Sequence, residues 1–153
     1  TINPHSPLLL SNKAAYLIFS QEPEEALEAA ETALSIDPAY TAAFLHKAHA
    51  LLLLGNGDEA RAALDEADNS DPRVLKMKAN ISLRLRDFEA GLSAAKALIE
   101  MTPEDDEAWS LLGSAFAYSG DSEGAVRAFQ QAMKLNPKEK TYKANLVAVK
   151  GMK

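Results

Sequence analysis

The side chains that could support chemistry are few and poorly grouped. His46 and His49 stand three residues apart, which places both imidazoles on one face of a helix, as in a pair of metal ligands. A metal site needs further ligands, and neither a carboxylate on that face nor a third histidine accompanies them. We therefore interpret both as partly exposed binding-surface residues. No metal, cofactor or catalytic residue is predicted.

A run of four acids, Glu104 to Glu107, resembles a carboxylate cluster, but it falls where a helix is expected to begin. Acids are favoured there by the helix dipole, so we interpret the run as a solvated helix start. Gly55-Asn56-Gly57 is a turn signal and not a phosphate-binding loop. The chain has no cysteine, which excludes disulfides and thiolate chemistry. We predict a non-enzyme; turnover that depends on His46 or His49 would contradict this.

Charge is unevenly distributed along an acidic chain of net charge −6. Residues 72–86 hold five Arg and Lys without an acid, and residues 138–153 hold five Lys against Glu139. One basic helix on an acidic body does not fit nucleic acid, which needs a broad basic surface. It favours an acidic or carboxylate-bearing partner peptide, because Arg binds carboxylates bidentately. Four polar residues fall on one helical stripe at i, i+3, i+7 and i+11: Arg73, Lys76, Asn80 and Arg84.

The sequence gives little information on compartment. The longest aliphatic run, Leu51 to Leu54, is too short to insert into a membrane. No signal peptide is visible, but the chain opens on Thr1, so a targeting segment outside it stays open and the cytoplasm is only favoured. Thr1-Ile2-Asn3-Pro4 matches Lys134-Leu135-Asn136-Pro137, from which we expect a piece of a longer array.

Regularly spaced prolines indicate a repeat protein. Successive separations are 34, 34, 31 and 34 residues, from Pro4 through Pro38, Pro72, Pro103 and Pro137. A fixed period of this size is typical of a helical solenoid. We predict one all-α domain, 1–153, whose helix pairs lie within 7–40, 41–71, 72–105 and 106–139, followed by a capping helix at 140–150.

Two junctions should depart from regularity. The second unit ends in Asp68-Asn69-Ser70-Asp71 where other units are apolar, so its later helix is expected to end early. The third unit is three residues short, so its first helix should begin at Pro72 with Asp71 as its cap. The shortened connection should change the superhelical pitch locally.

The fourth unit carries the most specific motif. Trp109, Leu112, Gly113 and Phe116 share one helix face, and Ala125 and Phe129 follow a Gly120-Asp121 turn. The small residues let two helices approach while the aromatic rings fill the remaining space. This pattern resembles the tetratricopeptide repeat (TPR), with Phe116 where the family usually has Tyr. The resemblance covers essentially the whole chain and implies a right-handed superhelix of about four repeats.

The resemblance also implies that the first helix of each repeat lines a concave groove for a partner peptide. Carried over by repeat position, the groove residues are Asn12, Ala15, Phe19, Leu45, His46, His49, Arg73, Lys76, Met77, Asn80, Arg84, Ser110, Ser114, Tyr118 and Asn145. Lys76 and Asn80 match half of the two-carboxylate clamp that some relatives use on chaperone tails. Leu111 stands where that clamp has Asn, and Thr141 and Asn145 stand where it has Lys and Arg.

The leading hypothesis is therefore a non-catalytic scaffold or adaptor that binds an extended or short helical segment of another protein. The alternative is an architectural segment that self-associates through Leu8-Leu9-Leu10, which leaves a homo-oligomer open. A further alternative is a chaperone-type module, either with a partial carboxylate clamp or similar to bacterial secretion chaperones in length and helical-repeat type.

Overall fold

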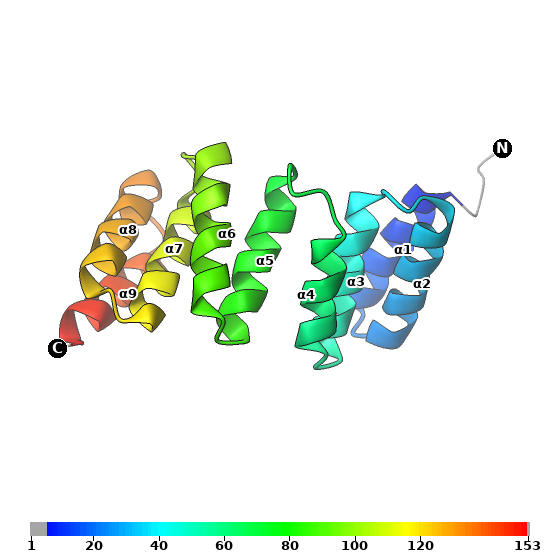
Figure 1. Cartoon of the computed structure of the whole chain (residues 1–153), viewed down its shortest axis with the longest axis horizontal. Helices are drawn as coiled ribbons and strands as arrows, with labels where there is room; N and C mark the ends of the chain where they lie inside the picture. The colour runs from blue at the N-terminus through cyan, green and yellow to red at the C-terminus, as the bar shows by residue number, and fades with distance from the viewer. Residues whose placement is uncertain (1–5, 153) are drawn as a thin grey trace. The chain divides into compact units, whose positions relative to one another are not determined.

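The computed structural model describes residues 6–152, and every regular element in that range is an α-helix (Figure 1). Contacts divide the chain into two compact units, one ending at Val74 and one beginning at Leu75, which we describe separately. No helix in the described range is long and apolar enough to cross a bilayer. The helices are α1 (Pro7–Phe19), α2 (Pro23–Ile36), α3 (Thr41–Leu53), α4 (Gly57–Asp65), α5 (Pro72–Arg84), α6 (Phe88–Met101), α7 (Asp106–Ser119), α8 (Ser122–Leu135) and α9 (Lys140–Gly151).

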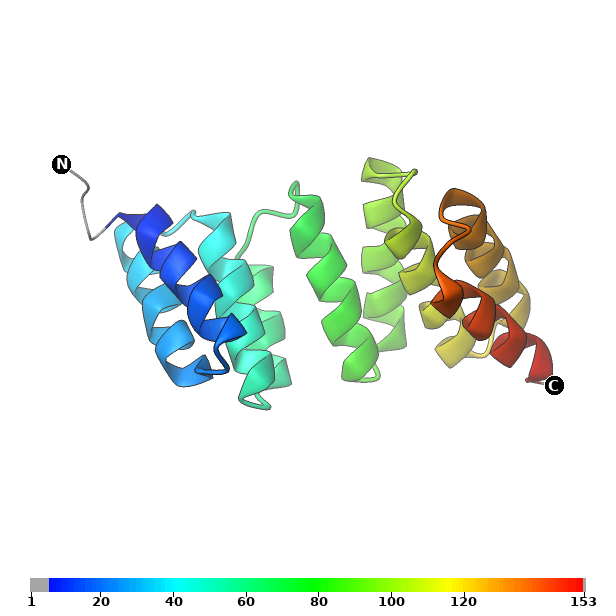
Figure 2. The ribbon, with the colours of Figure 1, turned by 180° about the vertical axis from the view of Figure 1, so that it is seen from behind.

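The first unit consists of two helix pairs with an alanine-rich core. Helix α1 packs on α2 and α3, and α3 packs on α4. Figure 2 shows α1 and α3 on one face of this unit, with α2 and α4 behind them. Small side chains let these helices approach closely, and the larger Leu17 fills the remaining space among Ala14, Ala26, Ala29, Ala30 and Ala50.

The second unit has a core built from larger residues. Leu75 and Ala79 of α5 pack with residues of α6 and α7. Gly113 lies so close to Phe129 that a Cβ there would stand 2.8 Å from its ring, which confirms the predicted close approach of α7 and α8. Helix α9 packs on α8, with Val149 against Phe129 and Leu146 beside them.

All four turns within helix pairs close in the same way. A residue with positive φ follows each first helix: Gln21, Gly55, Arg86 and Gly120. The backbone N–H of the next residue bonds a carbonyl five positions back, as from Glu22 to Leu17 at 2.9 Å and from Asp121 to Phe116 at 2.9 Å. This is the Schellman termination, which satisfies otherwise unpaired helix carbonyls.

Both irregular junctions agree with their sequence-based predictions. Helix α4 ends at Asp65 after nine residues, whereas α2, α6 and α8 have fourteen each. Helix α5 begins at Pro72, and the Asp71 carboxylate accepts the Arg73 N–H at 2.9 Å. Each predicted repeat range holds one helix pair, and 140–150 lies within α9. The change of pitch remains a prediction, and the Thr1–Pro4 match lies outside the described residues.

Candidate functional site

The first helices of the first unit form an open hollow of about 510 Å³. We call it the unit-one hollow; it is lined by Ala15, Ile18, Phe19, Gln21, His46, His49 and Leu53. Phe19 is 86% exposed at its rim. Burial, with smaller contributions from nearby His49 and Arg73, lowers the pKa of His46, so its imidazole is neutral at pH 7. The hollow is thus largely apolar, with polar imidazole edges.

Leu45 requires a correction. It was expected to line the groove, but it is only 8% exposed and belongs to the buried core. The residue lies one position after the core residue Phe44, and both side chains are covered. Asn12, by contrast, is exposed on α1 but does not line the hollow.

The basic stripe of α5 is largely occupied by acids of the chain itself. The guanidinium of Arg73 binds the Asp71 carboxylate through two nitrogens, with Nη2 at 2.6 Å and Nε at 3.1 Å. Hydrogen bonding from Arg73 is the largest cause that lowers the pKa of Asp71. Arg73 is therefore engaged at the start of its own helix.

Lys76 forms a bridge from α5 to the start of α7. Its Nζ lies 2.8 Å from Asp105 Oδ2 and 2.7 Å from Glu107 Oε2. Partial burial works against the charged form, but the hydrogen bonds to Asp105 and Glu107 outweigh it and raise the pKa of Lys76. The ammonium is therefore charged at neutral pH and held between two carboxylates.

Beside this bridge lies a second open hollow, of about 320 Å³. We call it the unit-two hollow; it is lined by Asn80, Glu107, Ser110, Leu111 and Tyr142. The Asn80 amide donates to the Lys76 carbonyl at 3.1 Å, which orients its side chain along the helix. Three helices, α5, α7 and α9, thus contribute hydrogen-bonding groups around one leucine.

The acidic run at 104–107 does more than open a helix, so its interpretation as a solvated face was incomplete. Asp105 caps α7 by accepting the N–H groups of Glu107 and Ala108, at 3.0 and 3.4 Å. Asp106 accepts the Tyr142 hydroxyl at 2.6 Å and the Asn136 amide at 3.0 Å. These bonds connect α7 to α9 and to the loop between α8 and α9.

The remaining groove residues are dispersed. Tyr118 stacks on Phe88, with ring centroids 5.5 Å apart and planes at 17°. Ser114 donates to the Ser110 carbonyl at 3.0 Å. Arg84 is exposed at the end of α5, and Met77 and Asn145 are half-buried. The structure thus gathers Phe19, His46 and His49 in one hollow, and Asn80 and Ser110 in the other.

The groove residues expected from the sequence did not include Glu107, although the repeat spacing indicates it. Aligning the repeats on their packing residues, Leu75 and Trp109, places Glu107 at the position of Arg73. Ser110, Ser114 and Tyr118 follow from the same offset of 34 residues. The helix-start interpretation of the acidic run hid this equivalence. Among the described residues, no cluster of three or more His, Asp or Glu could hold a metal.

Two models of the tetratricopeptide repeat match the chain, over residues 17–81 and 76–140. U-box domain-containing protein 70 of Oryza sativa subsp. japonica is 35% identical over 75 residues, which are 49% of this chain and 9% of that protein. The DnaJ homolog subfamily C member 7 homolog of Schizosaccharomyces pombe (strain 972 / ATCC 24843) is 27% identical over 94 residues, 61% of this chain and 20% of that protein. The chain thus spans a fifth or less of both relatives.

Solved structures show the same fold. TTC0263, a thermophilic TPR protein of Thermus thermophilus, superposes with a TM-score of 0.82 at 17% identity, covering 96% of this chain and 82% of that one. YrrB, described as a TPR protein with an unusual peptide-binding site, gives 0.77 at 18% identity and covers 96% and 77%. These likenesses confirm the predicted all-α helical-repeat architecture of the solenoid class.

Proposed function

Because the chain belongs to the tetratricopeptide repeat family, we propose that it is a non-catalytic adaptor that binds a segment of another protein on its first helices. TPR repeats in general form scaffolds for protein–protein interaction. The finer proposal is that the unit-two hollow receives the segment and that Lys76 binds one of its carboxylates. The observation that carries it is the convergence of Asn80, Ser110 and Leu111 beside a charged lysine.

The residues that line the unit-two hollow favour the binding of an extended or short helical segment. An amide side chain such as Asn80 offers both a donor and an acceptor, which matches the alternating groups of a peptide backbone. Leu111 adds apolar contact at the same place. The segment orders on binding, so we expect a modest, roughly micromolar affinity.

Arg84 supplies a second cation for the proposed partner. It is exposed, and it follows Lys76 by eight residues, which corresponds to about 12 Å along an α-helix. A partner with two acidic groups at that spacing would contact both. Arg73 does not take part, because the acid that binds its guanidinium, Asp71, is itself held at the start of α5 by the Arg73 backbone N–H.

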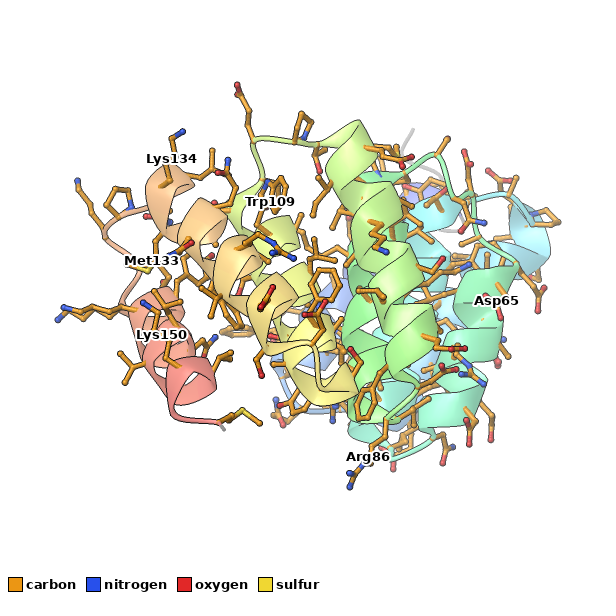
Figure 3. All side chains as sticks on the ribbon, turned by 60° about the vertical axis from the view of Figure 1, so that its left-hand side comes forward. Asp65, Arg86, Trp109, Met133, Lys134 and Lys150 are labelled. Carbon is orange, nitrogen blue, oxygen red and sulfur yellow. The ribbon has the colours of Figure 1, made fainter. Side chains whose placement is uncertain are left out.

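A peptide array tests this proposal. The probes are random twelve-residue peptides in matched pairs, each acidic peptide having a twin with Asn and Gln in place of Asp and Glu. We expect the wild type to retain acidic members over their twins and Lys76→Met to lose that preference. Lys134→Met is the matched control, since Lys134 projects from α8 (Figure 3). Equal retention of both twins by the wild type would overturn the proposal.

Self-association is a second candidate, favoured by one observation. Leu8 and Leu9 at the start of α1 are 56% and 37% exposed. Exposed apolar side chains of this size suit contact with a second copy. Light scattering of the same samples distinguishes the candidates: a mass above the monomer that falls in a Leu8→Ser, Leu9→Ser variant supports assembly. A carboxylate clamp of the chaperone type is not favoured, because Leu111 stands where that clamp has Asn.

A further inference from the structure

The Glu107 carboxylate occupies a position on Lys76 that adjoins the unit-two hollow, where a partner's carboxylate would bind. Glu107 Oε2 lies 2.7 Å from Lys76 Nζ, and the Glu107 side chain also lines the unit-two hollow. An ammonium has three donors, and Asp105 holds one of them at 2.8 Å. Glu107, which lines the unit-two hollow, holds a second donor, so the two acids together engage two of the three.

The two acids on Lys76 differ in how firmly they are held. Asp105 is 22% exposed in its side chain and accepts two backbone N–H groups as the cap of α7, so moving it would uncap the helix. Glu107 is 64% exposed and holds Lys76 through a single carboxylate oxygen. Exposed ion pairs of this kind contribute little to stability, so rotating Glu107 away costs little.

We propose that Glu107 is an intramolecular competitor, which leaves Lys76 when a carboxylate of the partner binds there. It sets a threshold, because a partner carboxylate that takes the position of Glu107 on Lys76 displaces that side chain and meets its charge beside the hollow. The inference rests on the proposed function and adds a residue that tunes the affinity and selectivity of the same site. Asp105 stays in place and keeps Lys76 oriented toward the incoming group.

Removing the charge of Glu107 should change the affinity for an acidic peptide in a definite direction. Neutralising Glu107 removes both the competition for Lys76 and the repulsion of an acidic partner, so acidic peptides should bind more tightly. A partner that instead placed a cation in the hollow would use Glu107 as a contact, and the same substitution would weaken binding. The direction of the effect therefore separates the two kinds of partner.

The test uses an acidic peptide retained on the array and its amide twin, with affinities measured by calorimetry. We expect Glu107→Gln and Glu107→Ala to raise the affinity for the acidic peptide about two- to fivefold, as expected for loss of an exposed pair. The affinity for the twin should stay unchanged. Glu104→Gln, which removes a nearby acid, is the matched control, and circular dichroism verifies the helix content.

Each other outcome has a definite meaning. If the wild type does not distinguish the acidic peptide from its twin, the proposed function fails and this inference falls with it. If the wild type distinguishes them and both Glu107 variants bind as the wild type does, only the competitor role is wrong. If the variants bind the acidic peptide more weakly, Glu107 contacts the partner directly and the inference is overturned.

Discussion

At the scale of single residues, two backbone conformations store strain. Gln21 and Arg86 adopt φ of 63° at turns where the other helix pairs have Gly55 and Gly120, with φ of 84° and 88°. A side chain in the left-handed region costs roughly 1–2 kcal/mol, whereas glycine adopts it freely. Arg86 projects outward from its turn (Figure 3), so its side chain can be removed without disturbing the core.

Gln21→Gly and Arg86→Gly should therefore stabilise the protein. We expect each to increase the free energy of unfolding by about 0.5–1 kcal/mol. This gain is the strain energy that is relieved, reduced by the entropic cost of ordering a more flexible glycine on folding. Thermal unfolding followed by circular dichroism measures the gain. Gly55→Ala is the opposite control and should lower the midpoint. Glycine variants that melt below the wild type would show that these turns are not strained.

Individual packing residues could be predicted from the sequence, whereas ion pairs could not. Gly113 and Phe129 meet as their spacing indicates, because a fixed repeat gives each position one kind of neighbour. Lys76 was expected to be available to a partner, yet Asp105 and Glu107, about 30 positions later, bind it. Which of several nearby acids pairs with a long flexible side chain depends on rotamers that no spacing rule specifies.

At the scale of elements, the start of α7 holds α9 in place through Asp106. The Tyr142 hydroxyl is the largest cause that lowers the pKa of Asp106, and the Asn136 amide adds to it. Burial, together with the hydrogen bond to Asp106, raises the pKa of Tyr142, so that its hydroxyl stays protonated. A carboxylate with a lowered folded-state pKa stabilises the fold above its unfolded pKa, and this contribution is lost as pH falls through the folded value.

Asp106→Asn should therefore be costly at neutral pH and less so in acid. We expect it to melt below the wild type at pH 7, by an amount worth about 1 kcal/mol, the usual contribution of a hydrogen bond. The difference should start to narrow as pH falls below about 4, the ordinary pKa of an unfolded aspartate, and should close below the lower folded value, where the wild-type carboxylate itself becomes protonated. Melting curves across this range, with exposed Glu104→Gln as the control, measure it. A difference that is constant with pH would contradict the assigned role.

The helices themselves follow closely from the sequence, because turn and capping residues act locally. Helix α4 ends early, at Asp65, ahead of the polar segment at 68–71, and Pro72 with Asp71 starts α5 as expected. The role of Asp106 could not be foreseen, since its partners Asn136 and Tyr142 lie 30 and 36 positions away. The dipole argument explains why acids are tolerated at a helix start, but not what else they bond.

At the scale of the whole molecule, each compact unit carries its own candidate surface. The unit-one hollow is mostly apolar and includes His46, whose pKa is lowered by burial. The unit-two hollow is polar and lies beside the charged Lys76. We therefore place the carboxylate of the proposed partner on the second unit.

The most direct test of that assignment is an NMR titration of the full chain with an acidic peptide retained on the array. We predict the largest amide shift changes at Asn80, Ser110 and Leu111, with residues of α2 and α4 unaffected. Lys76→Met should abolish these changes, whereas Lys134→Met should preserve them. Shift changes concentrated on the second helices α6 and α8, or unaltered in Lys76→Met, would show that the first helices of the second unit do not receive the partner.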